Sequence, residues 1–226
     1  MRNKKQLYNL FYGSNYDSLY KGFSGFFFKQ THKNLEQLND KIIHKKNNLN
    51  ILEIGPGRHL HYDYIREKHF INRYYVYDNN DKNLLFLKKK YNLKLTYIKN
   101  LKKIKNNSLD RIICSHVIEH ISYPEEFILL ISKLLKKNGT ISVTLPCDPG
   151  LFWEIGRLYR YLTFWKFKNV SKREYSYHMA HEHVNSIQNL IAILKYNFPI
   201  YEESYLPLRI PSINFNLMYN IILNKK

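Results

Sequence analysis

The sequence predicts an α/β fold in which helices cover both faces of a doubly wound, mainly parallel β-sheet. Three observations lead to this class. Short apolar runs alternate with helical stretches between residues 49 and 146, the first run ends in a glycine-rich turn, and the chain of 226 residues is 44% hydrophobic. Such a chain can bury the core of one domain, and strands that alternate with helices form parallel sheets. We therefore expect a single domain over residues 1–226.

The alternating part of the chain supplies five strands and the helices between them. The strands are predicted at residues 50–55, 73–78, 94–100, 109–117 and 140–146. Helices are predicted from Arg58 onward, over residues 79–92 and over residues 122–139. The last of these has Pro124 and two acids in its first turn and lysines before Gly139 at its end, which are typical start and stop signals.

Two segments lie outside this alternation. Residues 1–48 are predicted to form a helical N-terminal extension or lid, with a helix that begins at the N-cap Thr31. Residues 147–184 are aromatic and basic, and we expect them to form an insertion over the carboxyl edge of the sheet. The remaining chain predicts an amphipathic helix and two antiparallel strands, at residues 185–198, 201–207 and 216–225.

The net charge of +18 suits nucleic acid, an anionic membrane surface or phosphorylated substrates. The lysines are dispersed, however, so an ordinary basic surface is the competing interpretation. No apolar segment follows the basic N-terminus as in a signal peptide, and the longest apolar runs are too short to span a bilayer. With only Cys114 and Cys147, we expect a cytoplasmic protein, with peripheral contact with the inner membrane left open.

The stretch "LNILEIGPGRHLHYDYI" contains the glycine-rich turn and predicts a cofactor site. Gly55 and Gly57 permit a tight turn and close approach of the backbone to a ligand, and Asp78 follows at the spacing of an acid that binds ribose hydroxyls. A dinucleotide site would have a third glycine where Leu60 stands. Glu53 would also oppose a pyrophosphate, whereas it suits S-adenosylmethionine, which carries an ammonium, a sulfonium and no phosphate.

The chain from residue 49 to 145 resembles the class I S-adenosylmethionine-dependent methyltransferases. "ILEIGPG" is similar to their first motif, "YVYDNN" to their acidic second motif, and "NNSLDRIICSHVIEHISYPEEFILLISKLLKKNGTISVTLP" to their later block. The resemblance implies a seven-stranded sheet of order 3-2-1-4-5-7-6, with strand 7 antiparallel and the insertion after strand 5. "LPCDPG", "EHVN" and "LRIPSINFN" together resemble small, type 11-like bacterial enzymes associated with envelope glycans, capsule or lipid head groups.

The resemblance also implies a set of residues around S-adenosylmethionine. The glycines would line its methionine part beside Glu53, Asp78 would bind the ribose, and Ser115 would flank the sulfonium. The adenine contacts depart from the family, because Asn100 follows the third strand where many members have an acid, and a glycine is often found near the position of His59. The implied cofactor-binding residues are Glu53, Gly55, Pro56, Gly57, Asp78, Asn79, Asn100, Leu101, Ser115 and His116.

Catalysis of methyl transfer consists mainly of positioning, and a general base is needed only when the nucleophile must lose a proton. The candidate catalytic residues are His116, His120, His181 and His183. A purely structural role competes for His120, which stands at a helix start. His178, His181 and His183 match no usual zinc spacing, so no metal site is predicted.

The acceptor is predicted to be small and anionic, such as a phosphorylated sugar, an envelope or capsule precursor, or a lipid head group. Basic side chains alternate with aromatic ones in the insertion, at Arg157, Arg160, Lys166 and Lys168. Nucleic-acid amino-methyltransferases of this fold usually carry a D/N-P-P-Y/F motif where this chain has "SHVIEH", which argues against nucleic acid. An RNA methyltransferase and an inactive methyltransferase-fold binding protein stay open as alternatives. The oligomeric state cannot be predicted.

Overall fold

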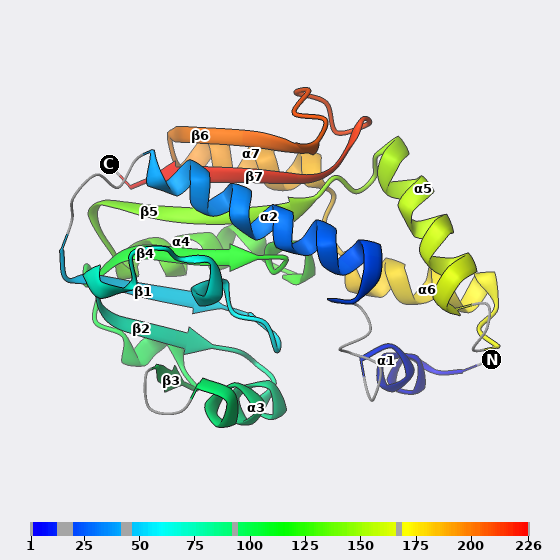
Figure 1. Ribbon diagram of the computed structural model, residues 1–226, viewed down its shortest axis with the longest axis horizontal. Helices are drawn as coiled ribbons and strands as arrows, with labels where there is room; N and C mark the ends of the chain where they lie inside the picture. The colour runs from blue at the N-terminus through cyan, green and yellow to red at the C-terminus, as the bar shows by residue number, and fades with distance from the viewer. Residues whose placement is uncertain (1, 13–19, 42–46, 92–94, 166–168, 226) are drawn as a thin grey trace.

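The computed structural model describes residues 2–12, 20–41, 47–91, 95–165 and 169–225, and a seven-stranded sheet forms its centre (Figure 1). The strand order is β3-β2-β1-β4-β5-β7-β6. β1 to β5 are parallel, and β7 is antiparallel to both β5 and β6. The predicted sheet is confirmed. Its strands are β1 (Leu49–Ile54), β2 (Ile71–Tyr77), β3 (Thr96–Ile98), β4 (Leu109–Ser115), β5 (Leu135–Pro146), β6 (Ile200–Pro207) and β7 (Asn216–Asn224).

Helices cover both faces of this sheet. The α-helices are α1 (Lys4–Tyr12), α2 (Gly22–Asp40), α3 (Asp81–Tyr91), α4 (Pro124–Leu134), α5 (Leu151–Arg160), α6 (Lys172–Glu182) and α7 (Ile187–Asn197). α2 crosses one face over β5, β6 and β7, while α4 and α7 pack together on the other (Figure 1). α1, α5 and α6 gather beyond the carboxyl ends of the parallel strands, where ligands bind in open α/β sheets.

The helix predicted over residues 122–139 is shorter than expected. α4 ends at Leu134, and the following residues already belong to β5, in which Leu135 pairs with Leu109 of β4. Both of these leucines are fully buried. The residues from Leu135 onward therefore pair with β4 instead of forming the last helical turn that the lysines and Gly139 predicted.

The helix predicted to begin at Thr31 begins much earlier, at Gly22. Thr31 is no N-cap, since its hydroxyl donates to the carbonyl oxygen of Phe27 one turn back inside α2. Phe27 and Leu35 are both buried on the side of the helix that faces the protein. Residues 22–30 therefore extend the predicted helix toward the N-terminus, with Phe27 on its buried face.

No α-helix follows Arg58, in contrast to the prediction. That segment contains only short 3-10 turns, at His61–Tyr64 and Lys68–Phe70. Leu60 and His61 are adjacent in sequence and both fully buried, which the single buried face of a regular helix does not favour. Side-chain contacts, and not a helical repeat, thus direct the connection from β1 to β2.

The insertion and the C-terminal part agree with the prediction. The insertion contains α5, a short π-helical segment (Tyr161–Trp165) and α6, while Lys166 and Lys168 lie outside the described residues. α7 is capped by Ser186, whose hydroxyl accepts the N–H of Asn189. Among the described residues, no helix has the length and apolar content needed to cross a membrane.

A buried ion pair joins α2 to the sheet. Arg111 of β4 donates to the carboxylate of Glu36 at 2.8 Å and to the hydroxyl of Ser142 at 2.8 Å. His61 contributes a further 2.8 Å hydrogen bond to Glu36. Burial would raise the pKa of Glu36, but Arg111 and His61 lower it to about 2, so the carboxylate is ionised inside the protein.

Arg111→Met should strongly destabilise the fold, because it leaves the buried Glu36 carboxylate without its cation. We expect the free energy of unfolding at neutral pH to fall by about 3–5 kcal/mol. Lys99→Met is the matched control, since it breaks an exposed pair with Asp81 and should cost less than about 1 kcal/mol. Urea unfolding measures both values, and similar losses in the two variants would contradict the importance of the buried pair.

Candidate active site

The turn after β1 requires glycine at two positions. Gly55 and Gly57 have φ angles of +64° and +62°, in the left-handed region. The N–H of Gly55 donates to the carbonyl oxygen of Tyr77 at 2.7 Å. A Cβ atom on Gly55 would lie only 2.8 Å from a methyl group of Val117, which follows β4. The turn therefore leaves the bare backbone of Gly55 at the cavity described below.

Glu53, at the end of β1, binds the segment that follows the glycine turn. Its carboxylate accepts the N–H of His61 at 2.7 Å and the hydroxyl of Tyr74 at 2.5 Å. Burial raises the pKa of Glu53 to about 7, although both hydrogen bonds oppose the shift. Glu53 also lines the cavity described below.

Asp78 links the end of β2 to the glycine turn. Its carboxylate accepts the N–H groups of Gly57 and Asn80, at 3.0 and 2.8 Å. Burial raises the pKa of Asp78, and these hydrogen bonds partly oppose that shift. Asp78 thus lies beside the glycine turn.

The three residues predicted to contact adenine differ in their burial. Asn79 and Asn100 are exposed, whereas Leu101 is buried in the hydrophobic core. The side-chain oxygen of Asn100 accepts the N–H of Lys102 and so caps a short 3-10 turn. The cavity lining includes none of these three residues nor Asp78, and the structure therefore separates this group from the cavity.

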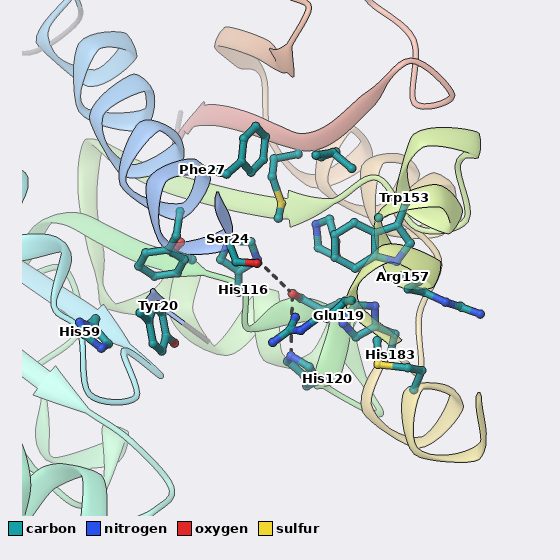
Figure 2. Close-up of a pocket in the computed structure, with 18 of the residues that line it drawn as sticks. Tyr20, Ser24, Phe27, His59, His116, Glu119, His120, Trp153, Arg157 and His183 are labelled. Carbon is teal, nitrogen blue, oxygen red and sulfur yellow. Dashed lines mark ion pairs between the residues drawn. The ribbon is translucent and has the colours of Figure 1, made fainter. Parts of the chain in front are cut away.

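A cavity of about 320 Å³ lies at the carboxyl ends of the strands (Figure 2). The N-terminal extension contributes aromatic and polar side chains, among them Tyr20, Ser24 and Phe28. The predicted cofactor residues that line the cavity are Glu53, Gly55, Pro56, Ser115 and His116. The segment after β4 and the insertion supply the rest of its polar lining, which includes Glu119, His120, Trp153, Arg157, Arg160, His178 and His183.

His116 stands directly after β4 in a strained conformation. Its φ angle is +57°, which is uncommon for a residue other than glycine and is often found at functional sites. The backbone N–H donates to the carbonyl oxygen of Thr144 at 3.1 Å. Its Nδ1 atom lies 3.7 Å from Glu119, while its buried Nε2 atom has no hydrogen-bond partner within the described part of the chain. His116 therefore lines the cavity and has an imidazole nitrogen that no described residue uses.

His120 and His183 lie together beside Glu119 (Figure 2). Glu119 is not among the predicted site residues. His120 Nε2 is 3.8 Å from a carboxylate oxygen of Glu119. His120 Nδ1 contacts the carbonyl oxygen of Glu182 at 2.5 Å, and His183 Nδ1 contacts the carboxylate of Asp148 at 2.7 Å. Burial would raise the pKa of Glu119, but the surrounding imidazoles lower it below its ordinary value, which favours the carboxylate.

The structure does not place His181 in this group. Its side chain is exposed and packs against Tyr177, with ring centroids 4.5 Å apart, and it is not part of the cavity lining. The neighbouring His178 does line the cavity. Burial and the charge of Arg160 lower the pKa of His178 to about 4, so it is neutral at neutral pH.

The insertion brings two arginines to the cavity. Arg157 forms an ion pair with Glu154 at 3.2 Å, while its buried Nε atom has no hydrogen-bond partner among the residues described. Arg160 forms no ion pair with any carboxylate of the described ranges. Trp153 stacks on His183 at a centroid distance of 5.6 Å. The insertion thus gives the cavity a cationic and aromatic wall.

A further contributor, His32, comes from α2 and was not predicted. Its Nδ1 atom lies 2.8 Å from His61 Nδ1, and His61 in turn bonds to Glu36. Burial, followed by the charge of His61, lowers the pKa of His32 well below its ordinary value. Only the position of His32 in a helix that crosses the sheet brings it to the cavity, so the sequence carried no signal for it.

Comparisons with known proteins agree with this architecture. Residues 25–195 match the family model described as a methyltransferase domain. No curated protein matches the sequence. The fold is similar to that of the N-methyltransferase NodS from Bradyrhizobium japonicum WM9 in complex with S-adenosyl-l-homocysteine, with a TM-score of 0.65, 14% identity and 99% of each chain covered.

Two further solved structures share the fold. For a SAM-dependent methyltransferase from Aquifex aeolicus the TM-score is 0.62 at 10% identity, with 100% of both chains covered. For one from Archaeoglobus fulgidus the TM-score is 0.59 at 18% identity, with 90% of this chain and 100% of that chain covered. The sheet and the glycine turn define the architecture of a class I methyltransferase. Because the family model spans most of its length, the chain belongs to the methyltransferase-domain family, which confirms the predicted S-adenosylmethionine-dependent enzyme class.

The raised pKa of Glu53 predicts a pH-dependent stability. Since this pKa is about 7 in the folded chain against an ordinary value of 4.5, the stabilisation from the bound proton is complete below about pH 4.5. It is lost as the pH rises to about 7. The glutamine side chain in Glu53→Gln cannot ionise. The free energy of unfolding of the natural chain minus that of the variant should therefore decrease as the pH rises from about 5 to about 8. Urea unfolding across this range measures the difference.

Glu126→Gln, which changes an exposed glutamate of α4, is the control and should give a curve parallel to that of the natural chain. A Glu53→Gln curve that also runs parallel would show that Glu53 ionises with an ordinary pKa.

Proposed function

We propose that this enzyme transfers the methyl group of S-adenosylmethionine to an oxygen atom of a small anionic acceptor. The observation that carries the proposal is the cavity itself. It joins the glycine turn on one side to an unpartnered imidazole nitrogen of His116 and to Arg157 and Arg160 on the other.

The donor side of the cavity fits S-adenosylmethionine. The backbone of Gly55, which lines the cavity, would lie against the methionine part, with Glu53 near its ammonium. The ribose would extend beyond the cavity lining toward Asp78, whose carboxylate accepts the N–H of Gly57. The hydroxyl of Ser115, buried and without a hydrogen-bond partner among the described residues, would flank the sulfonium. When bound, S-adenosylmethionine supplies an electrophilic methyl group.

His116 is positioned to accept the proton of the acceptor's hydroxyl group. His116 lines the cavity, its buried Nε2 atom has no hydrogen-bond partner among the described residues, and Glu119 beside its Nδ1 atom would stabilise the imidazolium that forms. His116 would take the hydroxyl proton at Nε2 while the acceptor oxygen bonds to the methyl carbon, and the donor would give up that methyl group and leave as a neutral thioether. His120 and His183 lie next to this path.

The acceptor's negative charge would bind between Arg157 and Arg160. A guanidinium suits a phosphate or a carboxylate because it offers two parallel donors. Trp153 and Met218 give the cavity apolar walls that suit the carbon skeleton. A phosphorylated sugar, an envelope or capsule precursor and a lipid head group all combine these features. Tyr20 and the α2 residues Ser24 and Phe28 would cover the acceptor from the N-terminal side.

An acceptor panel tests the function. Hydroxyl compounds that carry a phosphate or carboxylate are compared with their neutral analogues, and formation of S-adenosylhomocysteine is measured. Arg160→Gln should raise KM for anionic acceptors about ten- to a hundredfold, the equivalent of one charge-assisted hydrogen bond. His116→Asn, which tolerates the left-handed backbone, should lower kcat about 10²- to 10⁴-fold with little effect on KM.

Arg173→Gln, an exposed change on α6, is the control for charge and should leave both constants unchanged. Gly55→Ala should abolish donor binding and hence turnover of every acceptor. Equal turnover of neutral and anionic compounds, or identical effects of Arg160→Gln and Arg173→Gln, would exclude the anionic acceptor.

We also propose that α5 contacts an anionic membrane surface. Leu151, Ile155 and Leu158 of this helix are each about half exposed, at 54%, 56% and 50%, and the chain carries a net charge of +18. Ile155→Ser should weaken cosedimentation with vesicles that contain phosphatidylglycerol. Leu129→Ser, at a comparably exposed position on α4, should not. Absence of sedimentation by the natural chain would remove the membrane from the proposal.

A further inference from the structure

We propose that Glu119, His120 and His183 form a binding site for a divalent transition-metal cation at the acceptor side of the cavity. The side chains come from two segments, the turn after β4 and the residue that follows α6 (Figure 2). As to its role in methyl transfer, the inference rests on the proposed function, because the cation would activate the same acceptor oxygen. Its existence as a site does not depend on the acceptor.

The three side chains already stand at nearly the separation that a metal requires. One potential ligand atom from each lies within 4.8 Å of the other two. The rings of His120 and His183 have centroids 5.3 Å apart and are inclined by 72°. Ligand atoms about 2.1 Å from a shared zinc ion can be at most about 4.2 Å apart, so a small movement of side chains completes the set.

Both imidazoles have the tautomer that a metal ligand needs. A carbonyl oxygen can only accept, so the contact between His120 Nδ1 and Glu182 requires the proton on Nδ1. The carboxylate of Asp148 likewise accepts from His183 Nδ1. Each neutral ring therefore keeps its lone pair on Nε2. Such oxygen acceptors behind the rings are the usual outer partners of metal-bound histidines.

The backbone fixes these segments relative to each other. The N–H of Val184 donates to the carbonyl oxygen of Glu119 at 3.0 Å, and the side-chain amide of Asn185 donates to Ile121 at 2.6 Å. The N–H of Ile187 donates to the carbonyl oxygen of Asp148 at 2.8 Å. Three parts of the chain thus form one framework, so binding requires little ordering of the chain.

The burial of Glu119 is an independent observation that favours a cation beside this residue. Glu119 is only 1% exposed, and its Oε2 atom is buried without a hydrogen-bond partner among the described residues. A buried carboxylate oxygen without a partner is costly. The other oxygen of this carboxylate, Oε1, lies 3.8 Å from His120 Nε2, so a divalent cation bound between Glu119, His120 and His183 would neutralise the buried charge.

The ligand set indicates which cation and which chemistry. Two imidazoles and one carboxylate bind Zn²⁺ in catalytic sites and leave a position open for substrate. At that position a cation would bind the acceptor's hydroxyl oxygen and lower the pKa of that hydroxyl. The proton would pass to His116 Nε2, and the oxygen would then attack the methyl carbon. His116 thus acts as the base while His120 and His183 act as ligands.

Zinc binding to the whole, untagged chain tests the site. After removal of metal with a chelator and dialysis, Zn²⁺ is titrated by calorimetry, and bound metal is counted by mass spectrometry. We expect one Zn²⁺ per chain. His120→Gln and His183→Gln should each weaken binding at least tenfold, and Asp148→Asn, which leaves all three ligands in place, by about 10- to 100-fold.

His181→Gln is the matched control, since this exposed histidine lies two residues from His183 and outside the cavity lining, and it should bind Zn²⁺ as the natural chain does. Circular dichroism verifies that each variant is folded. If a variant of a ligand residue does not fold, the Zn²⁺ affinity of Asp148→Asn tests the site instead. Absence of saturable Zn²⁺ binding, or equal affinity of the folded ligand variants and His181→Gln, would overturn the proposal.

Binding of S-adenosylhomocysteine, measured in parallel, separates the two proposals. A chain that binds this nucleoside but no Zn²⁺ retains the proposed function and loses the metal site. A chain that binds Zn²⁺ through these residues but methylates no hydroxyl compound, with or without Zn²⁺, retains the site and loses the proposed acceptor chemistry.

Discussion

The ion pair between Glu36 and Arg111 is the interaction on which the rest of the site depends. α2 supplies one wall of the cavity through Phe27, Phe28 and His32, and this helix is held to the centre of the sheet by a carboxylate that is ionised although it is buried. Breaking such a pair costs far more than breaking an exposed one, because a charge then stays in the interior. The position of α2 is therefore strongly determined, and with it the wall.

Three further parts of the chain meet α2 at the cavity. The turn after β1 provides bare backbone, the turn after β4 provides His116 and Glu119, and the insertion provides the arginines and His183. The first two are adjacent because β1 and β4 are neighbours in the sheet, where the direction of strand order changes. The insertion is fixed to the second turn by backbone hydrogen bonds to Glu119. Donor and acceptor chemistry are thus brought together by the topology.

Much of the fold could be predicted because it follows from local patterns. The strands, the glycine turn and the antiparallel tail agree with the structure, and so does the family. Helix boundaries failed where tertiary contacts prevailed, as at Leu135, which enters the sheet, and His61, which is held by Glu53 and Glu36. In the site, His32 and Asp148 were missed because their roles depend on residues far away in sequence, at positions 61 and 183.

The contact between Gly55 and Val117 has a consequence for how the site can vary. These residues belong to the turns after two neighbouring strands, and the space between them is too small for one additional carbon atom. Because Val117 directly follows His116, the two turns behave as one mechanical unit. A change of volume at position 117 would shift the base relative to the donor without altering either. The distance between the proposed base and the donor would therefore depend on how closely Val117 packs against Gly55.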